Sequence, residues 1–294
     1  MKIFDCTTYF EEDMMMEIRF NILNQYVDKF IVCEASFSHS GSKKKINFNK
    51  NNFPKFKNKI VHLIMENEPE NLEQNKNSDP RIARSNSIKR INSQRDYIIH
   101  SLKEADGDDI IMYSDNDEIP NLSKFDFKNN KEEIIIFKQK LFYYKFNLSY
   151  PKIDWFGTKA CKFKNLKSIT WLRNIKNKKY NIFRLDTFFS EMKYKNVKII
   201  DNGGWHFTNL KTPKELLRKY LNDEMHSEFE LKKDNLKDIE YKVKNKFINY
   251  DHLTDTKSTN EKKQNNRFEL TKTNLNILPN YIQDNLDRYK SWID

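Results

Sequence analysis

Short apolar runs that alternate with amphipathic stretches predict an α/β fold for residues 1–120. Four runs have the length and composition of buried strands: residues 2–7, 29–35, 59–65 and 109–113. The stretches 11–27 and 84–105 repeat their apolar residues at helical spacing. Strands that alternate with helices of this length predict a largely parallel sheet with right-handed crossovers.

After residue 121 the pattern becomes more aromatic and richer in strands. The apolar runs of this half lie at residues 132–150, 155–163, 169–173 and 196–207, and all are grouped with the strands. A helix is predicted from Pro213 onward, because Thr212 can cap it and Glu215 stands three residues after the cap. Residues 231–274 are polar and rich in Lys and Asn, and they show no clear pattern.

The predicted helix 84–105 carries an arginine within its apolar stripe. The apolar members of the stripe are Ile88, Ile91, Ile98 and Leu102. Arg95 occupies the missing position, so its side chain is expected on the inward face. Two interpretations are open: a structural ion pair, or a phosphate ligand that faces a cleft.

An acidic turn, "SDNDEIP" at residues 114–120, follows the fourth predicted strand. In α/β sheets the ligand crevice lies at the carboxyl ends of the strands, which is where this turn falls. Asp115 and Asp117 are two residues apart, so both carboxylates can converge on one hard divalent cation. Pro120 stands where a calcium-binding EF-hand loop requires glycine, so that motif is excluded. A solvated surface turn is the alternative.

Two further segments carry candidate chemistry. In "DNGGWHF", two glycines after an apolar run allow unusual backbone angles, Trp205 offers a stacking face, and His206 is a metal ligand or a structural histidine. In "EASFSHSG", Glu34 lies at the carboxyl end of a predicted strand, and a polar loop follows. It can accept hydrogen bonds from a base or a ribose, or it can be an ordinary strand-end carboxylate.

The chain of 294 residues has 53 Lys and Arg against 42 Asp and Glu, a net charge of +11. This balance favours an anionic partner, although the lysines are dispersed, as in a solvated basic coat. One hypothesis is therefore a non-catalytic basic module that binds nucleic acid or an anionic surface, with aromatics interleaved among lysines as in "KQKLFYYKF". That hypothesis leaves the clustered carboxylates unexplained.

Three cysteines, Cys6, Cys33 and Cys161, are odd in number and far apart, which disfavours a disulfide framework or a zinc site. Cys6 and Cys33 lie in apolar runs and are predicted to be buried free thiols. The N-terminal residues do not have the pattern of a signal peptide, and no run of 18 apolar residues occurs. A cytoplasmic location is therefore expected.

These motifs together resemble a known family. The segments "IFDCTTYF", "VCEASFSHSG", "DDIIMYSDNDEIP", "DNGGWHFTNL" and "HSEF" follow one another within residues 1–230. In this combination the chain resembles glycosyltransferase family 17, the family of β-1,4-mannosyl-glycoprotein 4-β-N-acetylglucosaminyltransferase. The resemblance implies a GT-A-like fold, a UDP-GlcNAc donor, a divalent metal (Mn²⁺ or Mg²⁺) and inversion at the anomeric carbon.

The resemblance and the motifs give a set of expected site residues. The expected metal ligands are Asp115, Asp117 and His206. The expected nucleotide-sugar contacts are Thr7, Glu34, His39, Ser40, Gly41, Lys45, Arg95, Asp96, Asp115 and Asn116. Trp155 and Trp205 are expected to bind the acceptor. The candidate bases are Asp201, Glu228 and Glu118; Asp201 is preferred, because the glycine turn beside it can open onto both metal and acceptor.

The expected organisation follows from these assignments. Residues 1–230 form a GT-A-like domain with a mostly parallel central sheet and helices on both faces; residues 1–120 bind the nucleotide sugar, and residues 121–230 bind acceptor and metal. Residues 231–294 form a helical, polar extension. The expected partners are a UDP-sugar and a glycan or glycolipid acceptor, not nucleic acid, with peripheral contact at the inner face of the membrane as an added option. A degenerate transferase fold that only binds carbohydrate is a third hypothesis, which the intact motifs disfavour.

Overall fold

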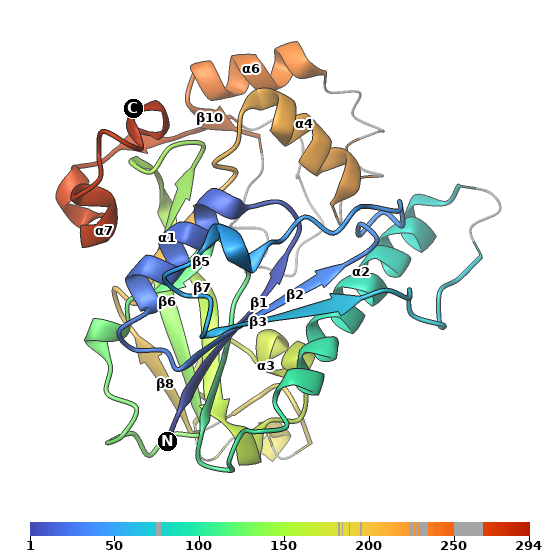
Figure 1. Ribbon diagram of the computed structural model, residues 1–294, viewed down its shortest axis with the longest axis vertical. Helices are drawn as coiled ribbons and strands as arrows, with labels where there is room; N and C mark the ends of the chain where they lie inside the picture. Colours follow the sequence, from blue (N-terminus) through green and yellow to red (C-terminus); the bar gives the residue numbers. More distant parts are fainter. Residues whose placement is uncertain are drawn as a thin grey trace.

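The computed structural model describes all residues except 75–77, 182, 184, 188, 195, 224–225, 227–228, 230–234 and 250–266. Its centre is a ten-stranded sheet with the strand order β3-β2-β1-β4-β7-β6-β9-β5, in which β12 also pairs with β7 and β8 with β6. Helices cover both faces of this sheet (Figure 1). The fold is the predicted α/β class.

The first half of the chain forms the parallel part of the sheet. Its elements are β1 (Ile3–Tyr9), α1 (Asp13–Leu23), β2 (Lys29–Ala35), β3 (Ile60–Met65), α2 (Pro80–Tyr97) and β4 (Ile110–Tyr113). β1 pairs in parallel with both β2 and β4, and β2 pairs in parallel with β3. All four predicted strands and both predicted helices of this half are confirmed.

The second half makes the sheet mixed rather than mostly parallel. Its elements are β5 (Glu118–Pro120), β6 (Ile134–Tyr143), β7 (Leu148–Lys162), α3 (Ile169–Asn174), β8 (Val197–Ile200) and β9 (Gly204–Thr208). The run 169–173 is therefore a helix and not a strand, because Ser168 caps it by accepting the N–H of Trp171. β7 runs antiparallel to β4 and β6, and β5 runs antiparallel to β9. The short 144–147 connection explains part of this change, because a loop of that length joins antiparallel strands, whereas parallel strands need a long crossover.

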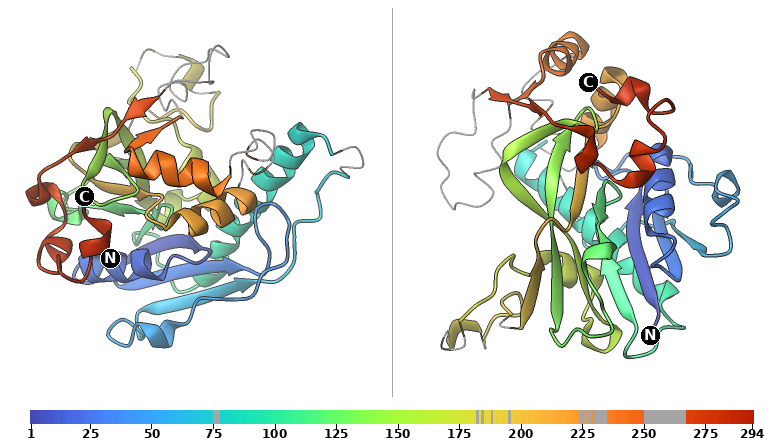
Figure 2. Two further views of the ribbon diagram at one scale, coloured as in Figure 1. Left: turned by 90° about the horizontal axis from the view of Figure 1, so that it is seen from above. Right: turned by 90° about the vertical axis from the view of Figure 1, so that its left-hand side faces the viewer.

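The C-terminal region adds small elements to the same body. They are α4 (Pro213–Asn222), α6 (Leu236–Lys244), β10 (Phe247–Ile248), β11 (Phe268–Glu269), β12 (Thr271–Lys272) and α7 (Asn280–Gln283). The predicted capping box of Thr212 and Glu215 begins α4. Figures 1 and 2 place α4 and α6 beyond the carboxyl ends of β1 and β2, with the N-terminus at the opposite end of the sheet.

Short 3₁₀ helices complete the described structure. They lie at Lys50–Asn52, Ile98–Ser101, Leu122–Lys124, Phe163–Asn165, Leu185–Thr187, Leu275–Ile277 and Lys290–Trp292. The Ile98–Ser101 turn continues α2 and together with it accounts for most of the predicted helix 84–105.

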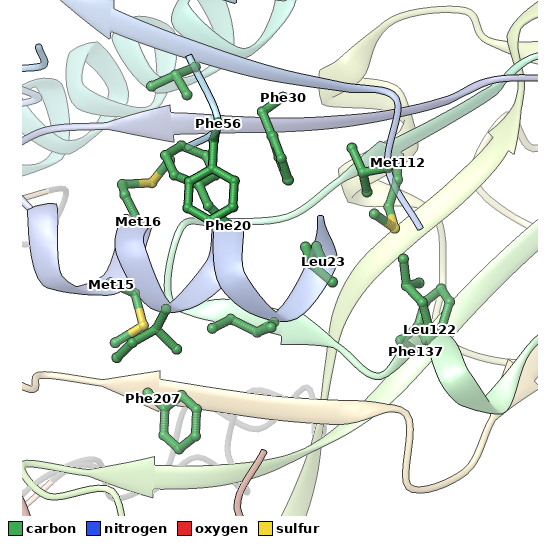
Figure 3. Close-up of a cluster of buried hydrophobic side chains, with 14 of the residues drawn as sticks. Met15, Met16, Phe20, Leu23, Phe30, Phe56, Met112, Leu122, Phe137 and Phe207 are labelled. Carbon is green, nitrogen blue, oxygen red and sulfur yellow. The ribbon is translucent and has the colours of Figure 1, made fainter. Parts of the chain in front are cut away.

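Each face of the sheet has its own hydrophobic core. Figure 3 shows Met16 and Phe20 of α1 in one core beside Phe30 of β2, and the rings of Phe20 and Phe30 have centroids 4.7 Å apart. The other core joins alternate residues of β1 and β2, among them Cys6, to α3. All three cysteines are buried free thiols, as predicted for two of them. Within the described part of the chain, no helix is long and apolar enough to cross a bilayer.

Candidate active site

A cavity of about 270 Å³ lies at the carboxyl ends of the parallel strands. Its walls come from the end of β1, the loop after β2, α2, the acidic turn after β4, and from β7, β9 and α4. The polar lining residues are Thr8, Glu12, His39, Lys44, Gln94, Arg95, Asp115, Asn116, Asp117, Glu118, His206, Thr208, Lys219, Asn222 and Asp223. The acidic turn is therefore part of a cavity wall at the ligand-binding edge of the sheet.

Asp115 is held by two arginines and a tyrosine. The Arg173 Nη2 lies 2.8 Å from one carboxylate oxygen, while the Arg95 Nη2 (3.3 Å) and the Tyr113 hydroxyl (3.1 Å) reach the other. Burial disfavours the charged form, but the two guanidinium groups outweigh it and hold the pKa of Asp115 well below its usual range. Both oxygens of this carboxylate thus have protein partners.

Glu118 is fully buried at the start of β5. Its Oε1 accepts hydrogen bonds from the Trp155 indole (2.5 Å) and from Arg173 (2.8 Å), and its Oε2 accepts the backbone N–H of Asp115 (3.1 Å). Burial raises the pKa of Glu118, although Arg173 opposes this. Arg173 therefore bridges two carboxylates of the turn, and Glu118 ties the turn to β7.

Asp117 faces an imidazole across the antiparallel β5–β9 pair. Its Oδ1 lies 3.4 Å from the Nε2 of His206, and this neighbour lowers the pKa of Asp117 against the effect of burial. The Nδ1 of His206 is buried and has no hydrogen-bond partner in the described structure. Of the acidic side chains in the turn, Asp117 is the one paired with a potential metal ligand.

The residues fit a divalent cation only through part of the predicted ligand set. Asp115 is bound by arginines, and the described residues contain no group of three His, Cys, Asp or Glu side chains arranged to hold a metal. Asp117 and His206 supply one carboxylate and one imidazole. This small donor set suits Mg²⁺ or Mn²⁺, which is commonly bound by one or two protein groups together with substrate phosphates and water.

Cationic side chains surround the acidic turn. Arg95 and Lys44 line the cavity from α2 and from the loop after β2, and Lys219 lines it from α4. Burial opposes the charge of Lys219, but the carboxylates of Asp223 and Asp117 outweigh burial and raise its pKa. The cavity thus presents fixed positive charge next to the carboxylate that can hold a metal, an arrangement that suits a diphosphate.

Several predicted site residues come together in this cavity. They are His39, Arg95, Asp115, Asn116, Asp117, Glu118, Trp155 and His206. For Arg95 the two open interpretations coincide, because this side chain forms an ion pair with Asp115 and also lines the cavity. The amide of Asn116 donates to Glu12 at 2.9 Å, which fixes the middle of the turn.

Other predicted ligands point elsewhere. Glu34 is fully buried and accepts hydrogen bonds from Lys44 and from the backbone N–H groups of Asn47 and Phe48, so it anchors the loop rather than facing a nucleotide. Asp96 accepts the N–H of Thr170 and thereby joins α2 to α3. Thr7, Ser40, Gly41 and Lys45 do not line the cavity; Thr8 and Lys44 do.

The glycine turn before β9 also lies outside the cavity wall. Asp201, the preferred base, has a side chain 75% exposed and pairs with Lys138 at 3.0 Å. Trp205 donates its indole N–H to the carbonyl of Ile277 at 2.6 Å and packs against the core. Neighbouring residues of a strand point to opposite faces, so His206 reaches the cavity and Trp205 cannot. Glu228 lies outside the described residues.

Sequence reasoning missed three cationic residues at or beneath the site. Arg173 and Lys219 are far from the turn in sequence, and their helical context gave no signal for a site. The apolar residues at helical spacing in the predicted helix 11–27 are Met15, Ile18, Ile22 and Tyr26, and Arg19 is not among them, yet its side chain is fully buried below the turn. A buried arginine has few partners other than carboxylates and carbonyl oxygens, but sequence alone does not identify which arginines are buried.

The fold and the cavity define a class: a GT-A-like α/β protein with an acidic turn at the carboxyl ends of its strands. Within this class the chain belongs to glycosyltransferase family 17, whose family model matches residues 1–290. A search of curated proteins found no match. The chain is therefore a glycosyltransferase, and the family match extends well beyond the 230 residues that carry the recognised motifs.

Proposed function

We propose that this protein is a metal-dependent, inverting glycosyltransferase that moves GlcNAc from UDP-GlcNAc onto a hydroxyl group of a glycan or glycolipid. The observation that carries the proposal is the pairing of Asp117 with His206 inside a cavity that Arg95 and Lys219 also line. These features together suit a nucleotide sugar, because its diphosphate is both a metal ligand and a strong anion.

The lining suggests how a donor would lie. The aromatic side chains of Tyr9, Phe10 and Phe37 line the cavity and offer contact area to a nucleobase. The acidic turn lies beside the expected diphosphate. Trp155 packs against His206, with ring centroids 4.8 Å apart, and offers an apolar face to a sugar ring.

A divalent ion would be held by Asp117 and His206. When bound, Mn²⁺ or Mg²⁺ would neutralise the charge that grows on the departing nucleoside diphosphate. Asp115 has a different part in this proposal: its ion pairs keep Arg95 and Arg173 in place. Arg95 and Lys219 add positive charge on the protein side.

Inversion requires a base for the acceptor hydroxyl. Asp201 does not line the cavity and pairs with Lys138 instead, and both oxygens of Glu118 accept hydrogen bonds from the protein. Glu228 stays a predicted base. The glycan acceptor, the cytoplasmic location and contact with the inner membrane surface are likewise predictions from the sequence.

A donor-binding experiment with two matched variants tests the proposal. Thermal unfolding is followed with UDP-sugars alone, Mn²⁺ alone and both together, and turnover is measured by UDP release. Wild-type protein should gain most stability with UDP-GlcNAc and Mn²⁺ together, since ligands that bind only the folded state raise Tm. Asp117→Asn should lower turnover by about 100-fold or more, as expected for loss of a transition-state electrostatic contact.

Asp201→Asn is the control, because it makes the same chemical change in an exposed turn outside the cavity. It should keep wild-type donor binding and turnover. If Asp117→Asn keeps metal-dependent turnover while Asp201→Asn loses it, the proposed metal site is wrong. Tight, salt-sensitive nucleic-acid binding without any response to UDP-sugars would instead support the basic binding module.

A further inference from the structure

Arg19 is fully buried in the middle of α1, directly beneath the acidic turn. An arginine side chain has five N–H donors in a planar fork, and each donor that is buried without a partner destabilises the folded state. Here the fork has five acceptors within hydrogen-bond distance. Every N–H donor of the Arg19 side chain can therefore be paired, so this buried arginine is part of a complete hydrogen-bond network.

Asp5 of β1 accepts two of these hydrogen bonds. The Nε of Arg19 lies 2.7 Å from one oxygen of Asp5, and the Nη2 lies 2.5 Å from the other. Both side chains are excluded from solvent, at 0% and 1% exposure. This bidentate pair fixes the plane and the direction of the guanidinium group.

The remaining donors all reach the acidic turn. Nη2 donates to the Ser114 hydroxyl at 2.7 Å, and Nη1 donates to the carbonyl oxygens of Glu118 at 2.9 Å and Asp115 at 3.4 Å. One side chain thus contacts the first, second and fifth residues of the segment 114–118. In the sequence, Asp117 lies between the contacted residues Asp115 and Glu118.

We propose that Arg19, oriented by Asp5, is a positioning residue that sets the backbone of the turn 114–118 and thereby aims Asp117 at the donor diphosphate. The pair lies on the α1 face of the sheet and does not line the cavity, so Arg19 acts through the turn and not by contact with substrate. The inference rests on the proposed function for the catalytic consequence. The claim that Arg19 sets the backbone of the turn does not depend on the proposed function.

Three variants separate positioning from general stabilisation. Arg19→Lys keeps the charge next to Asp5 but has only three donors and no planar fork, so it cannot reach all the turn acceptors. Leu23 lies one helical turn away in the same α1, is fully buried in the core and does not line the cavity, so Leu23→Ala perturbs the helix without removing a polar contact to the turn. Ser114→Ala removes one of the three turn contacts and nothing else, which covers the case in which Arg19→Lys does not fold.

Two readouts are measured on the full chain. The first is steady-state transfer from UDP-GlcNAc with Mn²⁺ at a temperature where each variant is folded. Arg19→Lys should lower kcat/KM by about 100-fold, because a small misplacement at a distance from the chemistry can have that effect. Ser114→Ala should show a smaller loss, and Leu23→Ala should keep the wild-type value despite a lower Tm.

The second readout is amide hydrogen exchange, which needs no ligand. The N–H of Glu118 donates to the carbonyl of Asp115 at 3.0 Å, and that of Asp115 donates to Glu118 Oε2. Both amides should exchange faster in Arg19→Lys than in Leu23→Ala, while β2 stays protected in both. Equal exchange at the turn in the two variants would overturn the proposal, as would equal losses of kcat/KM. A wild-type protein that transfers no sugar would refute the proposed function but leave the exchange result decisive.

Discussion

The side chains of the turn "SDNDEIP" differ in role because of what lies behind them. Asp115 and Glu118 share Arg173, whereas Asp117 pairs with His206 in the cavity wall. From the sequence, Asp115 and Asp117 are equivalent carboxylates at positions i and i+2. The distinction comes from a cation on α3, and no local pattern near the turn could reveal it.

Lys159 of β7 extends this network and gives a pH prediction. Its Nζ donates to the carbonyls of Arg173 (2.7 Å) and Ile175 (2.5 Å), and burial lowers its pKa to about 7, with Arg173 adding to the effect. In the unfolded chain the pKa of this lysine is about 10.4, so it stays protonated until the pH approaches that value. Between pH 7 and about 10 the unfolded state therefore binds more protons, so stability should rise with pH.

Urea unfolding of wild-type protein and Lys159→Met across this pH range checks the prediction. The free energy of unfolding of wild-type protein should increase relative to that of Lys159→Met as pH rises, and the difference should level off below pH 7. Lys162→Met, on the same strand but with a side chain 35% exposed in an ion pair with Asp108, is the control and should retain the wild-type slope. Parallel curves for wild-type protein and Lys159→Met would contradict the prediction.

At the scale of elements, β9 brings His206 opposite Glu118, and two glycines make that placement possible. Gly204 has φ of +139°, and a Cβ there would lie 2.2 Å from the carbonyl oxygen of Ile119. A Cβ on Gly203 would lie 2.6 Å from the carbonyl oxygen of Ile200. The sequence predicted unusual backbone angles at these glycines, and Gly204 confirms this; the reason is the close approach of β5.

Gly204→Ala should therefore destabilise the protein and disturb the site together. The positive φ alone is expected to lower the free energy of unfolding by about 1–3 kcal/mol, and the clash with β5 adds to this. Chemical denaturation measures the loss, and UDP-GlcNAc turnover reports the displaced His206. Gly107→Ala is the matched control, since its nearest neighbour would be the Cβ of Lys164 at 3.5 Å. Equal stability of the two variants would count against this account of β9.

For the whole molecule, the C-terminal segment belongs to the main core. Leu278, Ile282 and Tyr289 are buried with α1 residues in the same cluster, and β12 pairs with β7. The predicted division placed residues 231–294 in a polar, helical extension. Among its described residues, α6 is helical, but the last part also supplies strands and buried side chains.

Removal of residues 275–294 should accordingly prevent stable folding. Three buried large side chains contribute about 5–9 kcal/mol by transfer free energy, which is comparable with the total stability of about 5–15 kcal/mol of many domains. Circular dichroism and thermal unfolding of the truncated chain provide the measurement. Two single substitutions in the same segment serve as references for the size of the effect. Ile282→Ala should lower Tm because Ile282 is buried, and Asn280→Ala should leave Tm unchanged because Asn280 is exposed. A truncated chain with wild-type Tm would disprove this role.

The amino-acid sequence by itself determined the features that depend on neighbours along the chain. Apolar periodicity placed the first four strands and their helices, the Thr212–Glu215 spacing placed the start of α4, and the order of motifs indicated the family that the match over residues 1–290 shows. Each of these signals is local, because periodicity and capping act within a few residues.

Only the tertiary structure decided which side chains share the cavity. Arg19 and Arg173 reach the acidic turn from other elements, Trp205 turns away from the cavity while His206 enters it, and the side chain of Asp201 is left in solvent. These outcomes follow from strand pairing and from the antiparallel second half of the sheet. Pairing between distant segments is set by the packing of the whole core, so no stretch of the sequence near the turn contains that information.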